Sequence, residues 1–455
     1  MVEIETIVSE KNEQFSQKRW YQLFIIGVMG LLFFNISMLY LAMPSIAASL
    51  HVTFEARWLL LSYGLPFIFG IFINHQLIAR FGARQMALIG ISLFTIGSTL
   101  CGTALLFWQL IFFQVIQGIG GFLFWSSLQS VAEKHSVISK KHQQIAVLVG
   151  GIMGLLAGGI VVDLMNWHLI FFLNLPFGLA FYYLGLWLLP RTNANPESPI
   201  NHIDSFLTIF VFFFVALGFS PYWDVMGIPT FLFLLFALGI FLWIQFRQKG
   251  IDRHSFVFHH SKNDFWSNFF VRFIHALIGS ALAFLFPFFF AQELKWQMFG
   301  VGLLMIGFFL IMAGGTLIRK RFFSTISESI HVFVSSVILL VGLILCLPLN
   351  PEWNVFDLII RIAILGIGFG FYPFKFPTSW SPSSVHTNQS LFGSMGWFFG
   401  PVLCTLIWTP NHIDLLSTRM DMRIALFVLI LMIFGSLVYL ISRRLGKRSE
   451  DQLAE

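Results

Sequence analysis

Residues 150–159 read Gly-Gly-Ile-Met-Gly-Leu-Leu-Ala-Gly-Gly and lie inside a long apolar segment. Gly150, Gly154 and Gly158 recur every four residues, with Gly159 beside the last, so on a helix they form one smooth stripe. In lipid, stripes of small residues let two helix backbones approach closely. A short polar break and a second apolar segment follow at once. The stretch therefore predicts two membrane helices joined by a tight turn, the first of them suited to close packing or sliding.

The composition of the whole chain is that of a membrane protein with many spans. Of its 455 residues, 57% are hydrophobic and 11% are charged, and the mean hydropathy is +0.82. A soluble domain does not need this much apolar surface, whereas a polytopic membrane protein does. The three cysteines (Cys101, Cys346 and Cys404) lie in apolar runs without metal-ligand spacing, so we interpret them as packing residues.

Fourteen apolar runs are long enough to cross a bilayer. The longest polar connections bracket two of these runs and leave six on each side. The fourteen spans fall at about 20–44, 58–79, 85–104, 107–131, 144–163, 167–189, 203–220, 228–246, 265–291, 297–318, 329–348, 355–374, 385–408 and 423–442. The prediction is an all-α polytopic protein with a cytoplasmic segment (1–19), a six-helix bundle (20–190), a linker with two extra spans (191–262), a second six-helix bundle (263–442) and a cytoplasmic tail (443–455).

Basic residues are distributed unevenly over the predicted loops. If the N-terminus is cytoplasmic, 21 of the 27 lysines and arginines fall in cytoplasmic segments and 4 fall in outer loops. This bias follows the positive-inside rule. We therefore predict a multi-pass protein of a bacterial-type inner (plasma) membrane, with both termini in the cytoplasm. The net charge of +6 is then a signal of topology and not of nucleic-acid binding.

Several stretches of the first half form motifs. They are Asn35-Ile-Ser37 with Ala42-Met-Pro44 in the first span, Arg57-Trp58 with Ser62-Tyr63 in the second, Gln114-Val-Ile-Gln117-Gly118-Ile-Gly120 in the fourth, and the glycine stripe of the fifth. Together they resemble the fourteen-span drug:proton antiporter branch of the major facilitator superfamily. Arg80, Gly82 and Arg84 are similar to that family's conformational loop motif between spans 2 and 3. The resemblance implies a major facilitator fold, with two six-helix bundles and two central spans, and export of a small amphipathic molecule driven by proton entry.

The chain departs from the family motifs at three positions that are normally charged. Asn35 stands where the family has an acid, Gln114 where it has an arginine, and Ala79 where it has an aspartate. At about 1.5 Å per residue, Asn35 and Gln114 lie at similar depths, so we expect them to touch as a neutral amide pair. Losing both charges together is physically consistent, because one unpaired charge inside a membrane is costly. Gln117 is a candidate for lining the same cavity.

The second half carries ionisable side chains inside a span. Asn268, Arg272 and His275 lie on one face of the predicted helix at 265–291. Arg272 and His275 are candidates for substrate binding or coupling, and a histidine can carry a proton where Asn35 cannot. The simpler interpretation is that Arg272 pairs with Asp264 or reaches the membrane surface, and that His275 donates one interhelical hydrogen bond.

Asp357 and Arg361 are spaced i, i+4 near the outer end of another span. This spacing favours a structural ion pair. The second interpretation is that the two residues line a cavity and contact substrate.

The motifs predict a secondary transporter and not an enzyme. The glycine-rich runs lie inside apolar helices and not at strand-to-helix turns, so they are not nucleotide cradles, and no zinc-protease pattern is present. We expect no cofactor or metal, a small-molecule substrate, a lipid bilayer around a functional monomer, and no nucleic acid. A proton gradient is a candidate driving force, and a periplasmic adaptor and an outer-membrane channel are candidate partners. Two alternatives stay open: a proton-independent facilitator or uptake symporter of the same fold, and a non-transporting membrane receptor or assembly subunit.

Overall fold

A computed structural model describes residues 2–52, 57–134, 140–190, 195, 262–350, 352–373 and 415–454 of the chain. In these residues all regular structure is helical. The first half contains α1 (Val2–Ser49), α2 (Arg57–Phe81), α3 (Ala83–Gly102), α4 (Phe107–Lys134), α5 (Lys140–Leu164), α6 (His168–Phe172) and α7 (Asn174–Leu188). The second half contains α11 (Lys262–Gln292), α12 (Met298–Phe322), α13 (Glu328–Cys346), α14 (Val355–Phe371) and α16 (Leu415–Ala454).

The helices confirm the all-α membrane fold. Nine helices of the described part are long and apolar enough to cross a membrane. The predicted span at 167–189 is divided into α6 and α7 at Leu173. The runs at 203–220, 228–246 and 385–408 lie outside the described residues. The total of fourteen spans and the two extra central spans therefore stay predictions.

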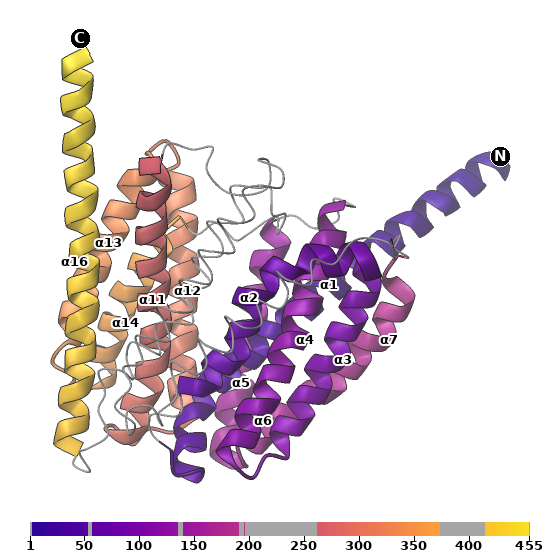
Figure 1. The fold of residues 1–455 in the computed structure, drawn as a ribbon, viewed down its shortest axis with the longest axis horizontal. Helices are drawn as coiled ribbons and strands as arrows, with labels where there is room; N and C mark the ends of the chain where they lie inside the picture. The colour runs from indigo at the N-terminus through magenta and orange to yellow at the C-terminus, as the bar shows by residue number, and fades with distance from the viewer. Residues whose placement is uncertain are drawn as a thin grey trace.

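The helices form two bundles that lie side by side (Figure 1). α1 to α7 make up one bundle, and α11 to α14 with α16 make up the other. Successive long helices alternate in direction, so α1, α3 and α5 all run away from the side on which the chain begins. Both chain ends lie on one side of the two bundles (Figure 1). That this side is the cytoplasm remains a prediction.

The glycine stripe of α5 packs against α1, backbone to backbone. A Cβ atom on Gly150 would lie 2.2 Å from the carbonyl oxygen of Gly30, and one on Gly154 would lie 2.3 Å from that of Phe34. Gly158 meets α1 in the same way. Real Cβ atoms do not approach other atoms this closely, so side chains are excluded from the stripe. The close packing predicted from the sequence is present, and its partner is the first helix of the same bundle.

The motif between α2 and α3 fixes a tight turn. Gly82 adopts a φ of 83° directly before α3, a conformation that favours glycine. Arg84 donates a hydrogen bond to the carbonyl oxygen of Leu186 on α7. The Arg80 guanidinium lies 5.9 Å from the ring centroid of Phe81. The turn and the start of α3 are thereby tied to α7, while a role in conformational change stays a prediction.

We predict that Gly154→Ala lowers the stability of the protein. The added methyl would collide with α1, and overpacking of this kind costs about 1–3 kcal/mol, which exceeds the gain of about 1 kcal/mol from the higher helix propensity of alanine. Gly314 of α12 is the matched control, because a Cβ there would meet no atom within 4 Å. The measurement is the free energy of unfolding in detergent. Equal effects of Gly154→Ala and Gly314→Ala would contradict the packing argument.

Candidate functional site

A network of neutral polar side chains lies inside the first bundle. The Asn35 Oδ1 atom of α1 accepts hydrogen bonds from Gln117 Nε2 of α4 (3.0 Å) and from Asn174 Nδ2 of α7 (2.8 Å). Asn174 Nδ2 also donates to the Ser98 hydroxyl oxygen of α3 (2.9 Å). All four side chains are buried. We call these four residues the amide cluster, and it joins four helices of the bundle.

The expected Asn35–Gln114 pair does not form. Gln114 is fully buried, and neither Oε1 nor Nε2 of its side chain has a hydrogen-bond partner in the described part of the chain. The partner of Asn35 is Gln117, one turn further along α4. Gln114 and Gln117 are three residues apart, so they lie on nearly the same face of α4 about one turn apart along its axis. Counting residues from apolar run ends does not fix depth to within one turn, so it did not decide between the two glutamines.

Among the described residues, several buried polar atoms near the amide cluster have no hydrogen-bond partner. They are Asn35 Nδ2, Asn174 Oδ1 and both side-chain polar atoms of Gln114. Tyr63 of α2 lies near Asn35 and packs against Gly121 of α4. A buried polar group without a partner costs about 1–3 kcal/mol, so these atoms mark a place where water or a polar ligand group would be stabilised. Because the groups are amides, they can donate to or accept from a polar group without supplying a counter-charge.

His275 is fully buried in the second bundle and is surrounded by polar atoms. Its Nδ1 atom lies 2.8 Å from the carbonyl oxygen of Val271. Its Nε2 atom lies 3.4 Å from Ser335 Oγ and 3.3 Å from Ser336 Oγ on α13. The ring stacks on Tyr372, which follows α14, with centroids 4.1 Å apart. We call these groups the histidine cage, and they give His275 more contacts than the single interhelical hydrogen bond of the simpler interpretation.

Arg272 lies about one turn before His275 on α11. Its side chain is half-buried. The side chains of Asp264 and Asn268 lie outside the described part of the chain. The pairing of Arg272 with Asp264 therefore stays a prediction, as does a role for Arg272 in binding substrate.

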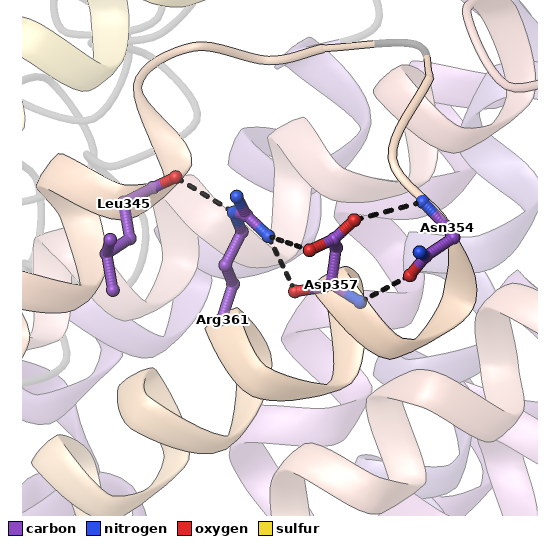
Figure 2. Close-up of polar contacts among 4 residues, drawn as sticks. All are labelled: Leu345, Asn354, Asp357 and Arg361. Atoms are coloured by element: carbon purple, nitrogen blue, oxygen red, sulfur yellow. Dashed lines mark hydrogen bonds and ion pairs between the residues drawn. The ribbon is translucent and has the colours of Figure 1, made fainter.

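Asp357 and Arg361 form the expected ion pair at a corner of the second bundle (Figure 2). Arg361 Nη1 lies 3.4 Å from Asp357 Oδ1, and Arg361 Nε donates to the carbonyl oxygen of Leu345 at the end of α13 (3.0 Å). Asp357 and Asn354 cap the start of α14 reciprocally. The Arg361 guanidinium also lies 4.2 Å from the ring centroid of Trp353. These contacts support the structural interpretation, because they hold the loop between α13 and α14.

The two bundles meet where α5 ends and α12 begins. The two carboxylate oxygens of Asp163 accept hydrogen bonds from the backbone N–H groups of Met298 (2.8 Å) and Phe299 (2.7 Å). A Cβ atom on Gly159 would lie 2.7 Å from Phe299 Cα, so the backbones nearly touch here as well. A carboxylate satisfies the unpaired N–H groups and the positive end of a helix N-terminus. We call this arrangement the α5–α12 contact.

The role of Asp163 was not predicted from the sequence, in which the polar residues after the glycine stripe indicated only a turn. The available signal was an acidic residue one turn after a glycine stripe, at a helix end where nothing else required a charge. The partner could not have been identified, because it is a pair of backbone groups that leave no pattern in the sequence.

Comparison with known proteins places this geometry in context. The model of the Major Facilitator Superfamily matches residues 25–399. Multidrug resistance protein 3 of Bacillus subtilis (strain 168) is 24% identical over 346 residues, which cover 72% of this chain and 66% of that protein. Multidrug efflux pump SdrM of Staphylococcus aureus (strain N315) is 24% identical over 233 residues, which cover 50% of this chain and 52% of the pump. The chain thus spans about half to two thirds of the length of these two relatives.

A solved structure shares the fold. It is a bacterial homolog of the human lysosomal transporter Spinster, with a TM-score of 0.62 and 14% identity. The match covers 94% of this chain and 97% of that one.

We predict that Asn35 and Gln117 are energetically coupled and that Asn35 and Gln114 are not. In a double-mutant cycle with alanine, contacting residues show interaction energies of about 0.5–3 kcal/mol, whereas independent residues add within about 0.5 kcal/mol. The measurement is the free energy of unfolding of the single and double variants in detergent. A larger coupling between Asn35 and Gln114 than between Asn35 and Gln117 would reject the hydrogen-bonding pattern described above.

Proposed function

The chain belongs to the major facilitator superfamily, and from this premise we propose that it is a secondary transporter that exports a small amphipathic molecule across the inner membrane. In the proposed mechanism, the two bundles rock about a central site, so that the site is open to one side of the membrane at a time. The relatives whose names mention multidrug resistance and efflux support the direction. A periplasmic adaptor, an outer-membrane channel and action as a monomer remain further proposals.

The observation that carries this proposal is the α5–α12 contact. α5 runs away from the side of the chain ends, so its last residue, Asp163, lies on the opposite side. Asp163 and Gly159 there join the first bundle to the second. One turn deeper, a Cβ atom on Gly302 of α12 would lie 2.9 Å from the carbonyl oxygen of Leu155. A rocking motion that opens the protein on this side would have to break these contacts, which makes them a closed gate.

The amide cluster lies well below this gate. Phe34, the neighbour of Asn35, touches Gly154. Gly154 lies nine residues before Asp163, a separation of about 14 Å along a helix. A molecule held at the amide cluster would therefore be separated by the gate from one side of the membrane. This is the arrangement that alternating access requires of a binding site.

The charges inside the spans favour a neutral or anionic substrate. In the described spans, carboxylates lie only at helix ends, at Asp163, Glu328 and Asp357. The amide cluster is uncharged, and Arg272 supplies a positive charge in the second bundle. A permanent cation would find no counter-charge in the middle of these spans, and an unpaired charge in such a place is costly. We therefore propose an amphipathic molecule that is neutral or negatively charged.

A facilitator or uptake symporter is the second candidate. The observation that favours it is the loss of the three family charges at Asn35, Gln114 and Ala79. With neutral side chains there, the first bundle offers no titratable group for antiport at the position that the family uses. Transport measured with and without a pH gradient distinguishes the two candidates.

The experiment that tests the function uses purified protein in liposomes. Three fluorescent amphipaths of similar size are offered, one neutral, one anionic and one with a quaternary ammonium group. We expect transport of the neutral or the anionic probe, and a several-fold lower rate for Asn35→Ala, because a buried hydrogen bond contributes about 1 kcal/mol. Gln143→Ala is the control, since this amide pairs with Gln129 outside the cluster. Transport of the cation alone would refute the charge argument, and transport of none of the probes would favour a receptor.

We predict that Asp163→Ala opens the gate. Loss of two hydrogen bonds to a carboxylate would cost at least about 3 kcal/mol and shift the closed-to-open ratio by roughly 100-fold or more. The measurement uses Leu155→Cys in a background without other cysteines, because Leu155 is buried at the deepest of the gate contacts. Its rate of labelling by a membrane-impermeant maleimide added on the gate side should rise in Asp163→Ala.

Two controls make this labelling result specific. Asp163→Asn keeps one acceptor oxygen and should give an intermediate rate. Glu352→Ala removes an exposed carboxylate from the loop between α13 and α14, on the same side of the protein, and should leave the rate unchanged. A rate that is the same in Asp163→Ala as in the parent would show that the gate does not depend on this carboxylate.

A further inference from the structure

The histidine cage presents hydrogen-bond acceptors to both ring nitrogens of His275. On one side, Nδ1 faces the carbonyl oxygen of Val271 at 2.8 Å, and a carbonyl oxygen can only accept. On the other side, Nε2 faces the hydroxyl oxygens of Ser335 and Ser336. The role of each serine depends on where its single hydrogen points.

Both serine hydrogens are already used. Ser335 Oγ donates to the carbonyl oxygen of Gly368 on α14 (2.8 Å), and Ser336 Oγ donates to that of Val332 in its own helix (2.8 Å). With these two bonds made, each serine offers only lone pairs to Nε2. A neutral imidazole has one N–H and one acceptor nitrogen, whereas an imidazolium has two N–H groups. Only the imidazolium satisfies all the hydrogen bonds of the cage at once.

If the ring is neutral and protonated on Nδ1, Nε2 receives a hydrogen bond only when one serine turns. Its hydrogen would then point to Nε2, and a carbonyl oxygen would lose its donor. If Ser335 turns, the bond that ties α13 to Gly368 of α14 is lost. If Ser336 turns, the loss stays within α13. The protonation state of His275 is therefore linked to the hydrogen bonds of α13, and through Ser335 to the contact between α13 and α14.

The surroundings of the cage are mixed in charge. Tyr372 stacks on the ring at 4.1 Å, and the face of an aromatic ring attracts a cation. Arg272 and Glu328 both lie close enough to Tyr372 to act on its hydroxyl electrostatically. At this end of the bundle α13 also carries His331, and the last turn of α12 carries Arg319, Lys320 and Arg321. In the stretches 20–49 of α1 and 424–441 of α16, which also pack on α11, the titratable side chains are tyrosines only.

We propose that His275 is a proton-binding residue, with the proton held between its ring and the oxygens of Val271, Ser335 and Ser336. The step is a simple proton uptake in which Nε2 gains a hydrogen and the ring gains a positive charge. The role of this proton rests on the proposed function, in which it would be the coupling ion that the neutral Asn35 cannot bind. The binding of the proton itself is measurable without transport.

The test is nuclear magnetic resonance of ¹⁵N-labelled imidazole rings in detergent, from pH 9 to pH 5. The signals of His275 are identified among the 13 histidines by their loss in His275→Gln. We expect one N–H at high pH and two at low pH. A ring that keeps a single N–H down to pH 5 would overturn the proposal.

Serine variants keep the test decisive if His275→Gln does not fold. Ser335→Ala and Ser336→Ala each remove one oxygen beside Nε2, and we expect each to shift the His275 signals and change their dependence on pH. Ser436→Ala is the matched control, because this buried serine of α16 bonds only within its own helix, to the carbonyl oxygen of Ile433. An unchanged titration in both cage variants would also overturn the proposal.

Transport assays distinguish a failure of the proton-binding proposal from a failure of the proposed function. If a pH gradient stimulates transport, we expect the stimulation to be lost in His275→Gln while transport without a gradient persists. Stimulation that persists in the variant would reject His275 as the coupling site. A protein that transports none of the probes while His275 still takes up a proton would reject the transport function and leave the proton site in place.

Discussion

In lipid, two helices can approach only as closely as the atoms on their facing sides allow, and α5 depends on this constraint on two of its faces. Gly150 and Gly154 let α5 touch the backbone of α1, so they complete the first bundle. Gly159 lets the end of the same helix touch α12 of the second bundle. The two contacts lie on one helix. A shift of α5 against α1 therefore also moves the end of α5 that touches α12. The amide cluster lies at the level of Gly154, because Phe34, the neighbour of Asn35, meets Gly154.

The sequence was sufficient for the fold but only partly for the site. Apolar length and charge bias locate membrane helices, because lipid imposes a minimum length and excludes charge. The stripe at Gly150 and Gly154 predicted close packing, because four-residue spacing determines a helix face. Counting residues from the ends of apolar runs was not enough to pair Asn35, since it does not fix depth to within one turn. Gln114 and Gln117 lie on nearly the same face of α4, about one turn apart. The contact of Asp163 was beyond prediction, because its partners are backbone atoms of a helix 135 residues away.

The two bundles carry different polar chemistry. In the first bundle, amides and a serine share hydrogen bonds without charge, and Asn35 Nδ2 and Asn174 Oδ1 have no partner among the described residues. In the second bundle, a histidine lies in a compact set of acceptors with an arginine nearby. Neutral recognition and proton chemistry are thus separated in the proposed mechanism. Such a separation allows a substrate group to be recognised by the first bundle whatever the protonation state of the second.

The contact at Asp163 has a consequence for how the protein can change during evolution. Only one of its partners is a side chain, since α12 contributes the backbone N–H groups of Met298 and Phe299. Nearly every residue type supplies the same N–H group, and proline alone lacks it. Mutational drift at Phe299, whose side chain is exposed, can therefore alter the shape and polarity of the outer surface without loosening the closure. Met298 is buried in the core, so packing constrains its side chain, while purifying selection on the hydrogen bonds themselves would act on the acidic residue opposite.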